Sequence, residues 1–241
     1  MKEKTYYSPN FSKKNRNQNS IKIIVIHYTG MKSQAESIAR LCSSKSKVSS
    51  HFLISENGKV FQLVEENKVA WHAGISRWGK FKNLNKNSIG IELVNKGHKF
   101  GYTSFTKKQI VSLLKICKSL IKKYKIKRKN IIGHSDIAPL RKIDPGEKFP
   151  WKKLAKNDVG IWHFCNPKLL KNYRNLTSFQ KKNKKTFISD LKKIGYSFSN
   201  QNSFLFTKTL KAFQRHYRQE LINGILDEEC LFIAKNLSEN L

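Results

Sequence analysis

Three side chains in this sequence are of the types that hold a catalytic metal ion. His27 ends the apolar run IKIIVIH, His134 follows the short apolar run IIG, and Asp144 lies in the IDPG segment after it. Because α/β sheets place their sites at strand ends and in the loops that follow, these three side chains could meet. Two imidazoles and one carboxylate leave the fourth position of a tetrahedral zinc ion open to water, as in catalytic zinc sites. The pattern predicts a Zn2+ site made by His27, His134 and Asp144.

Other histidines in the chain offer the same chemistry, so residue type alone does not single out this triad. They are His51, His72, His98, His163 and His216. A histidine at a strand end can equally be held by an ordinary hydrogen bond, with no metal nearby. Without further motifs, a metal site and a set of structural histidines both remain open.

Apolar runs and turn signals indicate the strands that would position these residues. Residues 21–27 and 88–95 are continuous runs rich in β-branched side chains, which are typical of strands buried on both faces. The apolar segments 51–55 and 59–64 flank Glu56-Asn57-Gly58, and Asn-Gly between two such segments predicts a hairpin.

Helices are expected between the strands. Residues 33–45 indicate a short helix, and residues 106–125 carry apolar side chains at helical spacing, with Thr106 or Ser104 as the N-cap. A short strand at residues 130–133 then leads to the second candidate ligand. Because strands and helices alternate, the sequence predicts an α/β fold with a central mixed β-sheet flanked by helices.

The chain divides into four predicted parts. A polar N-terminal extension covers residues 1–20, and the α/β domain with the candidate ligands covers 21–165. Residues 166–185, which begin with Asn-Pro and continue as a polar tract, are interpreted as a linker. Residues 186–241 predict a small domain of three short helices.

The charge is strongly basic, since 48 Lys and Arg against 16 Asp and Glu give a net charge of +32. Such a chain is attracted to polyanions, including nucleic acid, anionic lipid and acidic cell-wall polymers. Heavy use of Lys, Asn and Ile is also what an AT-rich genome produces, so the charge by itself names no partner. The basic residues are spread along the chain without a known nucleic-acid-binding motif, which argues against a nucleic-acid partner.

Cysteine content and hydropathy constrain the compartment only loosely. The four cysteines lie far apart, and Cys117 is expected to be a buried free thiol. No run approaches the ~20 apolar residues of a membrane span, and the polar N-terminus lacks the apolar core of a signal peptide. We expect either a cytoplasmic protein or, if a targeting segment has been removed, a protein of the bacterial cell envelope or periplasm.

A set of ordered motifs favours the metal site over a set of structural histidines. The segments IVIHYTG, VSSHFLISENGKVFQLV, WHAG, NSIGIELVN and GHSDIAPLRKIDPG resemble the type-2 N-acetylmuramoyl-L-alanine amidase family, whose fold is shared with peptidoglycan recognition proteins. They occur in the order of that family and cover roughly residues 21–165. In the family, zinc is held by the histidine of the first strand, the histidine of GHSD and the aspartate of DPG. These positions are the three candidate ligands named above.

The resemblance also implies catalytic partners for the metal. Glu92, in the GIEL segment, would be the general base that takes a proton from water. Lys142, two residues before the aspartate ligand, would stabilise the oxyanion of the tetrahedral intermediate. Some relatives have a tyrosine that shares this work at a position where this chain has Ser50.

Substrate contacts follow from the same resemblance. Trp71 and His72, in WHAG, resemble a family loop that lies beside the zinc and meets the muramyl-peptide. Arg77, Asn83 and Asn95 could bind carboxylates or amides of the stem peptide. The C-terminal part resembles, more weakly, a three-helix peptidoglycan-binding domain, with a helical packing appendage as the alternative.

The implied activity is zinc-dependent hydrolysis of the amide between N-acetylmuramic acid, or its anhydro form, and L-alanine. The substrate would be peptidoglycan or released muropeptides, in cell-wall turnover or recycling, and the oligomeric state stays open. Two alternatives remain: a peptidoglycan recognition protein that binds without cutting, and a basic nucleic-acid-binding protein.

Overall fold

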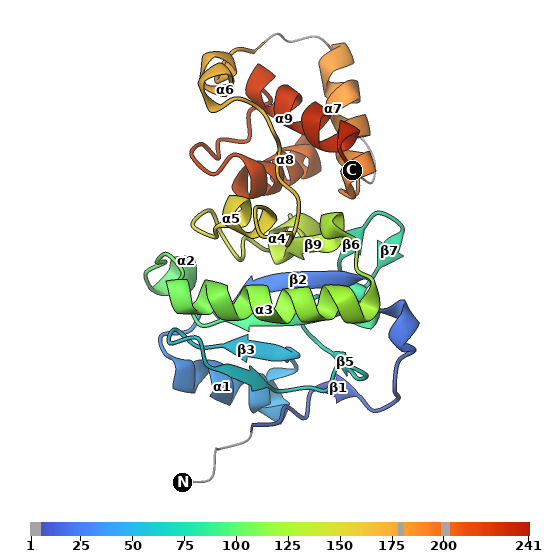
Figure 1. Cartoon of the computed structure of the whole chain (residues 1–241), viewed down its shortest axis with the longest axis vertical. Coiled ribbons are helices and arrows are strands. Elements are labelled where there is room, and N and C mark those ends of the chain that lie inside the picture. Colours follow the sequence, from blue (N-terminus) through green and yellow to red (C-terminus); the bar gives the residue numbers. More distant parts are fainter. Residues whose placement is uncertain (1–5, 178–180, 199–202) are drawn as a thin grey trace.

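The structure is a computed structural model that describes residues 6–177, 181–198 and 203–241. At its centre lies a five-stranded sheet in the order β4-β3-β8-β2-β9 (Figure 1). Its strands are β2 (Ile23–Tyr28), β3 (Phe52–Ile54), β4 (Val60–Gln62), β8 (Ser88–Leu93) and β9 (Ile131–Gly133). The pairs β3–β8, β8–β2 and β2–β9 are parallel and β3–β4 is antiparallel, which confirms the predicted mixed sheet.

Helices flank this sheet, as predicted. Helix α3 (Lys107–Tyr124) runs along it, and α1 (Gln34–Cys42) lies near β3 (Figure 1). The other helices are α2 (Gly97–Phe100), α4 (His134–Ile137), α5 (Trp151–Ala155), α6 (Pro167–Tyr173), α7 (Lys181–Ile194), α8 (Ser203–Tyr217) and α9 (Glu228–Glu239). In Figure 1, α6 to α9 gather above the sheet, and α4 and α5 lie between them and the strands. The three helices predicted after residue 186 are α7, α8 and α9.

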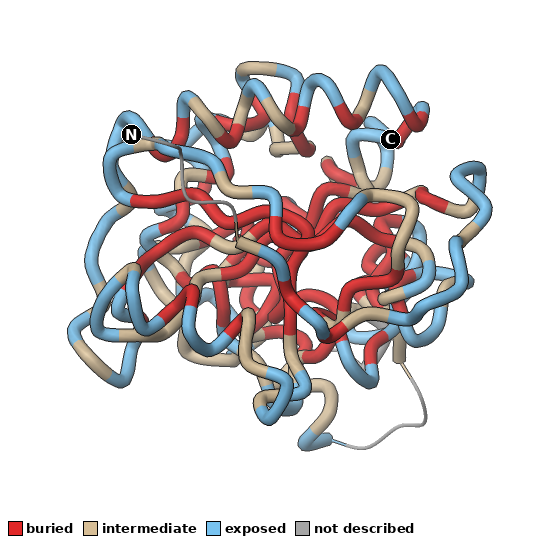
Figure 2. The backbone as a smooth tube through the Cα atoms, turned by 90° about the horizontal axis from the view of Figure 1, so that it is seen from below, coloured by how far each residue is buried: buried red, intermediate tan, exposed pale blue. Residues whose placement is uncertain are grey.

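Strand β2 explains why the first apolar run has no polar alternation. Ile24 and Ile26 pack into a core cluster with α3, whereas Ile23 and Val25 pack into a second cluster on the opposite side. Every side chain of this strand before its end is therefore buried, as expected for a central parallel strand. Figure 2 shows the same pattern for the whole chain, with buried residues along the central strands and exposed residues on the outer turns.

Local signals in the sequence account for the predicted boundaries. Thr106 caps α3 and forms a reciprocal capping box with Gln109. Gly58 in the β3–β4 turn has φ +86°, and a Cβ there would lie 2.9 Å from the backbone oxygen of Lys108. Only glycine fits such a position at no steric cost, so this Asn-Gly turn is specified both locally and by its contact with α3.

The N-terminal segment is more than the polar extension expected from the sequence. Strand β1 (Phe11–Ser12) pairs with β5 (Val69–Ala70), in an antiparallel ladder outside the central sheet. The buried Asn10 side chain donates to the carbonyl oxygens of Ser43 and Val48. Polar side chains here bond to backbone groups of the core, which is why a polar composition did not reveal an integrated segment.

The tract interpreted as a linker contains helix instead. Asn166 accepts a hydrogen bond from the Lys168 backbone N–H and Pro167 occupies the first turn, so Asn-Pro begins α6 rather than breaking the chain. Helix α7 also starts inside the expected linker, at Lys181, while residues 178–180 lie outside the described part. The polar composition of this tract gave no sign of either helix start.

Packing continues across residue 165, where the sequence suggested a domain boundary. One core cluster joins Ile23 and Val25 of β2, and Ile132 of β9, to Phe187 and Phe213 of the C-terminal helices. The division into 21–165 and 186–241 stays a prediction about independent units, because in the structure these segments share apolar core.

Smaller elements complete the described chain. A second hairpin joins β6 (Arg77–Trp78) to β7 (Phe81–Lys82), and 3-10 turns lie at Gln18–Ser20, Ser44–Ser46, Leu84–Lys86 and Arg128–Asn130. Cys117 is buried and free, as expected. Among the described residues, we find no helix with the length and apolar character needed to span a bilayer.

Candidate active site

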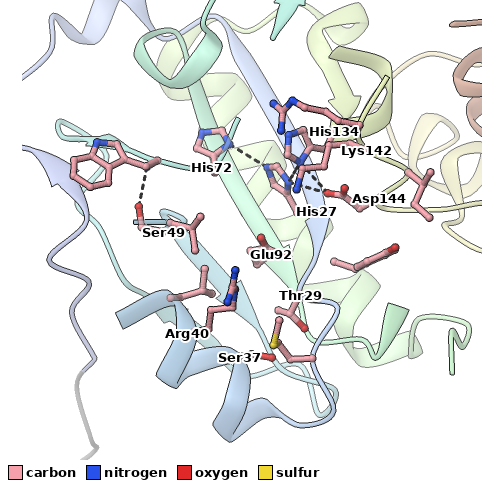
Figure 3. Close-up of a pocket in the computed structure, with 17 residues that line it drawn as sticks. His27, Thr29, Ser37, Arg40, Ser49, His72, Glu92, His134, Lys142 and Asp144 are labelled. Carbon is pink, nitrogen blue, oxygen red and sulfur yellow. Dashed lines mark hydrogen bonds and ion pairs between the residues drawn. The ribbon is translucent and has the colours of Figure 1, made fainter. Parts of the chain in front are cut away.

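The three predicted ligands converge on one buried point (Figure 3). Nδ1 of His27 lies 3.0 Å from Nδ1 of His134 and 3.0 Å from Oδ2 of Asp144. Nδ1 of His134 lies 3.2 Å from the same carboxylate oxygen. All three residues are buried, so the sequence prediction of a triad agrees with the geometry.

The sheet register brings these residues together. Strands β2 and β9 are parallel neighbours, with Ile26 paired to Gly133, so His27 and His134 follow at the same edge. His134 is the first residue of α4 and directly follows β9. The Ser135 backbone N–H then donates to the backbone oxygen of Asp144 (2.9 Å), which ties the loop of the third ligand to the start of α4.

Hydrogen bonds on the outer side of His134 fix which of its nitrogens carries the proton. Nε2 lies 3.2 Å from the carbonyl oxygen of Ala73. A carbonyl can only accept, so Nε2 of a neutral ring donates and Nδ1 presents a lone pair to the triad. The same carbonyl accepts a 2.6 Å hydrogen bond from Arg141.

A longer chain fixes the proton of His27. The Ser88 hydroxyl donates to the Leu84 carbonyl (2.6 Å), so its oxygen accepts from Nε2 of His72 (3.1 Å). The remaining Nδ1 of His72 then accepts from Nε2 of His27 (3.1 Å). Nδ1 of His27 is therefore a lone pair facing the triad, because each step leaves only one assignment.

The surroundings of His27 and Asp144 shift the pKa values of both groups. Burial, followed by repulsion from His134, lowers the pKa of His27 to about 4, which favours the neutral ring. Burial acts to raise the pKa of Asp144, but the neighbouring His134 and His27 outweigh it and hold that pKa well below the ordinary range. Asp144 is thus a carboxylate, and the ring of His27 is favoured in its neutral form.

With their ring protons turned outward, the two histidines and Asp144 would present three ligand atoms to one shared cation. Their separations of 3.0–3.2 Å suit ligands that each lie about 2.0–2.2 Å from one shared ion, the range for zinc with histidine and carboxylate ligands. The donor set of two nitrogens and one oxygen fits Zn2+ and leaves a further position open. This chain's residues therefore fit the predicted metal.

Glu92 faces the same cavity from the adjacent strand (Figure 3). In the parallel register of β2 and β8 it is the direct partner of His27, so both side chains point to the same face of the sheet. Its Oε2 is buried and has no hydrogen-bond partner among the described residues. Burial, followed by repulsion from Asp144 and partly offset by Lys142, raises the pKa of Glu92 to about 8.

A cavity of about 330 Å³ opens in front of the triad and Glu92. Lys142 and Trp71 line it, as predicted for an oxyanion stabiliser and a substrate contact, and His72 lies in its wall (Figure 3). Both ring nitrogens of His72 form hydrogen bonds, one to His27 and one to Ser88. These contacts indicate that His72 orients the candidate ligand His27. Ser50 donates its hydroxyl to the Gly90 carbonyl and is absent from the lining.

Three predicted substrate contacts lie elsewhere. The Asn95 side chain donates to the Thr103 carbonyl and accepts from the Gly97 N–H, so it holds a loop rather than facing the cavity. Arg77, together with Asn83, lines a separate cavity beside the β6–β7 hairpin. Neither Asn95 nor Arg77 lies at the triad. Asn95 bonds its own loop, and Arg77 lies on the β6–β7 hairpin, away from the metal ligands.

The sequence interpretation missed other cavity residues. Arg40 of α1, Tyr28 at the end of β2 and Arg141 beside Lys142 all line the cavity. Arg40 and Arg141 are two of 48 basic residues, so composition could not distinguish them. Tyr28 directly follows a candidate ligand, which was the one available signal.

Comparison with known proteins agrees with this geometry. Residues 17–147 match the family model described as N-acetylmuramoyl-L-alanine amidase. AmiD of Escherichia coli (strain K12), an N-acetylmuramoyl-L-alanine amidase, is 36% identical over 232 residues, which cover 91% of this chain and 83% of AmiD. The chain belongs to the N-acetylmuramoyl-L-alanine amidase family. The predicted family, fold and enzyme class are thereby confirmed.

Solved structures of amidases are similar over nearly the whole chain. A complex of AmiD from E. coli with the substrate anhydro-N-acetylmuramic acid-L-Ala-D-gamma-Glu-L-Lys has a TM-score of 0.80 and 34% identity, covering 95% of this chain and 92% of that one. AmpDh3 from Pseudomonas aeruginosa, in complex with anhydromuramic pentapeptide, has a TM-score of 0.80 and 30% identity, covering 100% and 99%. These similarities include the C-terminal helices of this amidase.

Proposed function

We propose that this amidase uses a zinc ion held by His27, His134 and Asp144 to hydrolyse the amide between the lactyl group of N-acetylmuramic acid and L-alanine. The observation that carries the proposal is the convergence of three acceptor atoms within 3.2 Å, beside a carboxylate oxygen that no described residue bonds. Relatives crystallised with anhydro-muramyl peptides support the substrate class, with anhydro-muropeptides as the form to test first.

The metal would supply two effects: polarisation of the scissile carbonyl and a lower pKa for the attacking water. The two histidines and the carboxylate would hold it at the edge of β2 and β9, where they line the cavity. Their outer hydrogen bonds, to Ala73 and through His72, keep the lone pairs pointed inward.

Glu92 provides the proton transfer. Its Oε2, which has no partner in the described part of the chain, would accept a proton from water as the oxygen attacks the lactyl carbonyl. When the C–N bond breaks, the same oxygen returns the proton to the alanine nitrogen. The products are the muramyl carboxylate and the free amine of the stem peptide, so one water is consumed and no other reactant is needed.

Lys142 provides positive charge at the cavity wall. Its ammonium would stabilise the negative oxygen that develops as the lactyl carbon becomes tetrahedral. The Lys142 backbone N–H donates to the Ala138 carbonyl, which fixes the residue to the turn after α4 and so to the metal site.

Two variants test the proposal. Glu92→Gln keeps the ligands and removes the base, so we expect normal zinc content with turnover of anhydro-muramyl-tripeptide reduced by about 10²–10⁴-fold. His134→Ala removes a ligand, so zinc content should fall with activity. Release of stem peptide is followed by chromatography and zinc by elemental analysis, with Lys115→Ala on the exposed side of α3 as a control outside the cavity. Undiminished turnover in Glu92→Gln, or zinc-independent turnover in the parent protein, contradicts the proposal.

A further inference from the structure

A second carboxylate lies two residues after the metal ligand His134 and is held by the C-terminal helices. Oδ2 of Asp136 accepts from the Gly133 backbone N–H (2.8 Å) and from Nδ1 of His216 (2.8 Å). Oδ1 accepts from the Tyr196 hydroxyl (2.6 Å). Asp136, His216 and Tyr196 are all at most 2% exposed, so these bonds form without competition from water.

Asp136 is placed to control the metal site. It is the third residue of α4, whose first residue is His134, and its carboxylate caps the start of that helix. The next residue after His134 donates its backbone N–H to the backbone oxygen of Asp144. The helix ends at Ile137, and the carbonyl of the following residue, Ala138, accepts from Lys142. A shift of α4 would therefore move two ligands and the oxyanion lysine together.

The two donors from the C-terminal part of the chain, His216 on α8 and Tyr196 just after α7, are themselves fixed by packing. The His216 ring stacks on Trp151, with centroids 3.8 Å apart and planes inclined by 16°. The Tyr196 ring packs edge-on against Trp78 (4.9 Å, 65°). A Cβ on the preceding Gly195 would lie 2.3 Å from the Trp78 ring, so this approach requires glycine.

We propose that Tyr196 and His216 are positioning residues for the metal site, acting through Asp136 on His134. The inference rests on the proposed zinc function. It assigns to the C-terminal helices a part in holding the zinc ligands, beyond the wall-binding role that their sequence resemblance suggests. Removing an outer hydrogen-bond partner of a metal ligand commonly lowers metal affinity about 10–100-fold. Tyr196 and His216 lie one bond further out, since they bond Asp136 and not His134, so we expect effects at the lower end of this range.

Matched variants separate this role from general stability. Tyr196→Phe removes one hydroxyl, and His216→Phe keeps a ring against Trp151 but removes the donor. His216→Asn restores an N–H donor without the full ring. Tyr217→Phe is the control. It removes the hydroxyl of a buried tyrosine on α8, and this hydroxyl is not one of the donors to Asp136 described above.

Zinc affinity of the full chain is measured by competition with a chelator, and the visible spectrum of the cobalt-substituted protein reports ligand geometry. We expect Tyr196→Phe and His216→Phe to bind zinc about tenfold or more weakly, with an altered cobalt spectrum. His216→Asn should recover part of the affinity, and Tyr217→Phe should match the parent. Turnover at saturating zinc should show a lower kcat with little change in KM.

The outcomes are distinguishable from failure of the proposed function. If the parent protein binds no zinc, the proposed function itself is wrong. If the parent binds zinc and the folded Tyr196→Phe and His216→Phe variants bind it as tightly, with the parent's cobalt spectrum, the positioning role is overturned. The positioning role is overturned as well if Tyr217→Phe weakens zinc binding as much as Tyr196→Phe.

Discussion

This amidase has two neighbouring buried clusters of histidine and aspartate, one around Asp136 and one around Asp144. They differ in whether the groups that face the aspartate donate or accept hydrogen bonds. Around Asp136, every bond comes from a donor: a backbone N–H, a histidine N–H and a tyrosine hydroxyl. Around Asp144, the two facing histidine nitrogens are acceptors, because their protons point outward. The Asp136 carboxylate is satisfied by donors of the protein, whereas in our proposal a cation completes the second cluster.

The comparison shows that residue type does not identify a metal site. Both clusters pair an aspartate with buried histidine, and their aspartates flank the same turn after β9. What differs is the number of protons available between the side chains. That number is set by outer partners such as Ala73 and Ser88, whose contacts with the histidines only the structure shows.

Exchanging each aspartate for asparagine is the strongest way to break this contrast. Asp144→Asn removes the anionic ligand, so zinc binding should be lost and turnover should fall by about 10³-fold or more, since a Lewis acid supplies several kcal/mol. Asp136→Asn places an amide against its three donors and should lower the free energy of unfolding by about 3 kcal/mol.

Chelator competition, turnover and denaturant unfolding of the metal-free proteins measure both variants. Because its histidine neighbours hold the pKa of Asp144 below the ordinary range, metal-free Asp144→Asn should also lose stability. The loss should be smaller than in Asp136→Asn, because the new amide can still bond a histidine nitrogen. A loss of metal-free stability in Asp144→Asn as large as in Asp136→Asn contradicts the contrast.

A smaller effect is expected where the proton of His27 is set. His72→Phe keeps a ring in place but leaves Nε2 of His27 without its acceptor. Zinc affinity should fall about 10–100-fold, with Trp71→Phe as a cavity-wall control that retains affinity. If His72→Phe binds zinc normally yet raises KM, His72 contacts substrate, as the sequence resemblance suggested, and the proton chain is not needed.

The smallest effect concerns Glu92 in the metal-free protein. Its pKa rises from 4.5 to about 8 through burial, so the folded state disfavours the carboxylate. The wild-type free energy of unfolding should therefore fall as pH rises from about 4.5 to 8, relative to Glu92→Gln. Each pKa unit corresponds to about 1.4 kcal/mol, and partial exposure of the side chain reduces the total to about 1–3 kcal/mol.

Urea unfolding of both proteins at pH 5 and pH 8, without metal, tests this sign. Glu92→Gln should be the more stable protein at pH 8, with the difference shrinking at pH 5. An equal difference at both pH values would show that Glu92 does not titrate in this range.

The sequence predicted much of the fold because its signals were local. The apolar run of β2, the Asn-Gly turn at Gly58 and the Thr106 cap each act within a few residues. The helical start at Asn166-Pro167 was missed because the same dipeptide suits a turn or a helix N-terminus.

The candidate site was only partly predictable for a related reason. Motif order located the triad, Glu92 and Lys142, and the structure brings all of them to one cavity. The misplaced contacts, Arg77 and Asn95, and the bonds from Tyr196 and His216 to Asp136 depend on contacts far apart in sequence. Neither composition nor spacing encodes those contacts.

A crystal structure of the zinc-loaded amidase, with anomalous scattering recorded at the zinc edge, tests the central claim most directly. We predict one zinc peak between Nδ1 of His27, Nδ1 of His134 and Oδ2 of Asp144, with Nε2 of His134 still bonded to the Ala73 carbonyl. A peak elsewhere, no peak, or coordination through Nε2 of either histidine would contradict the assignment.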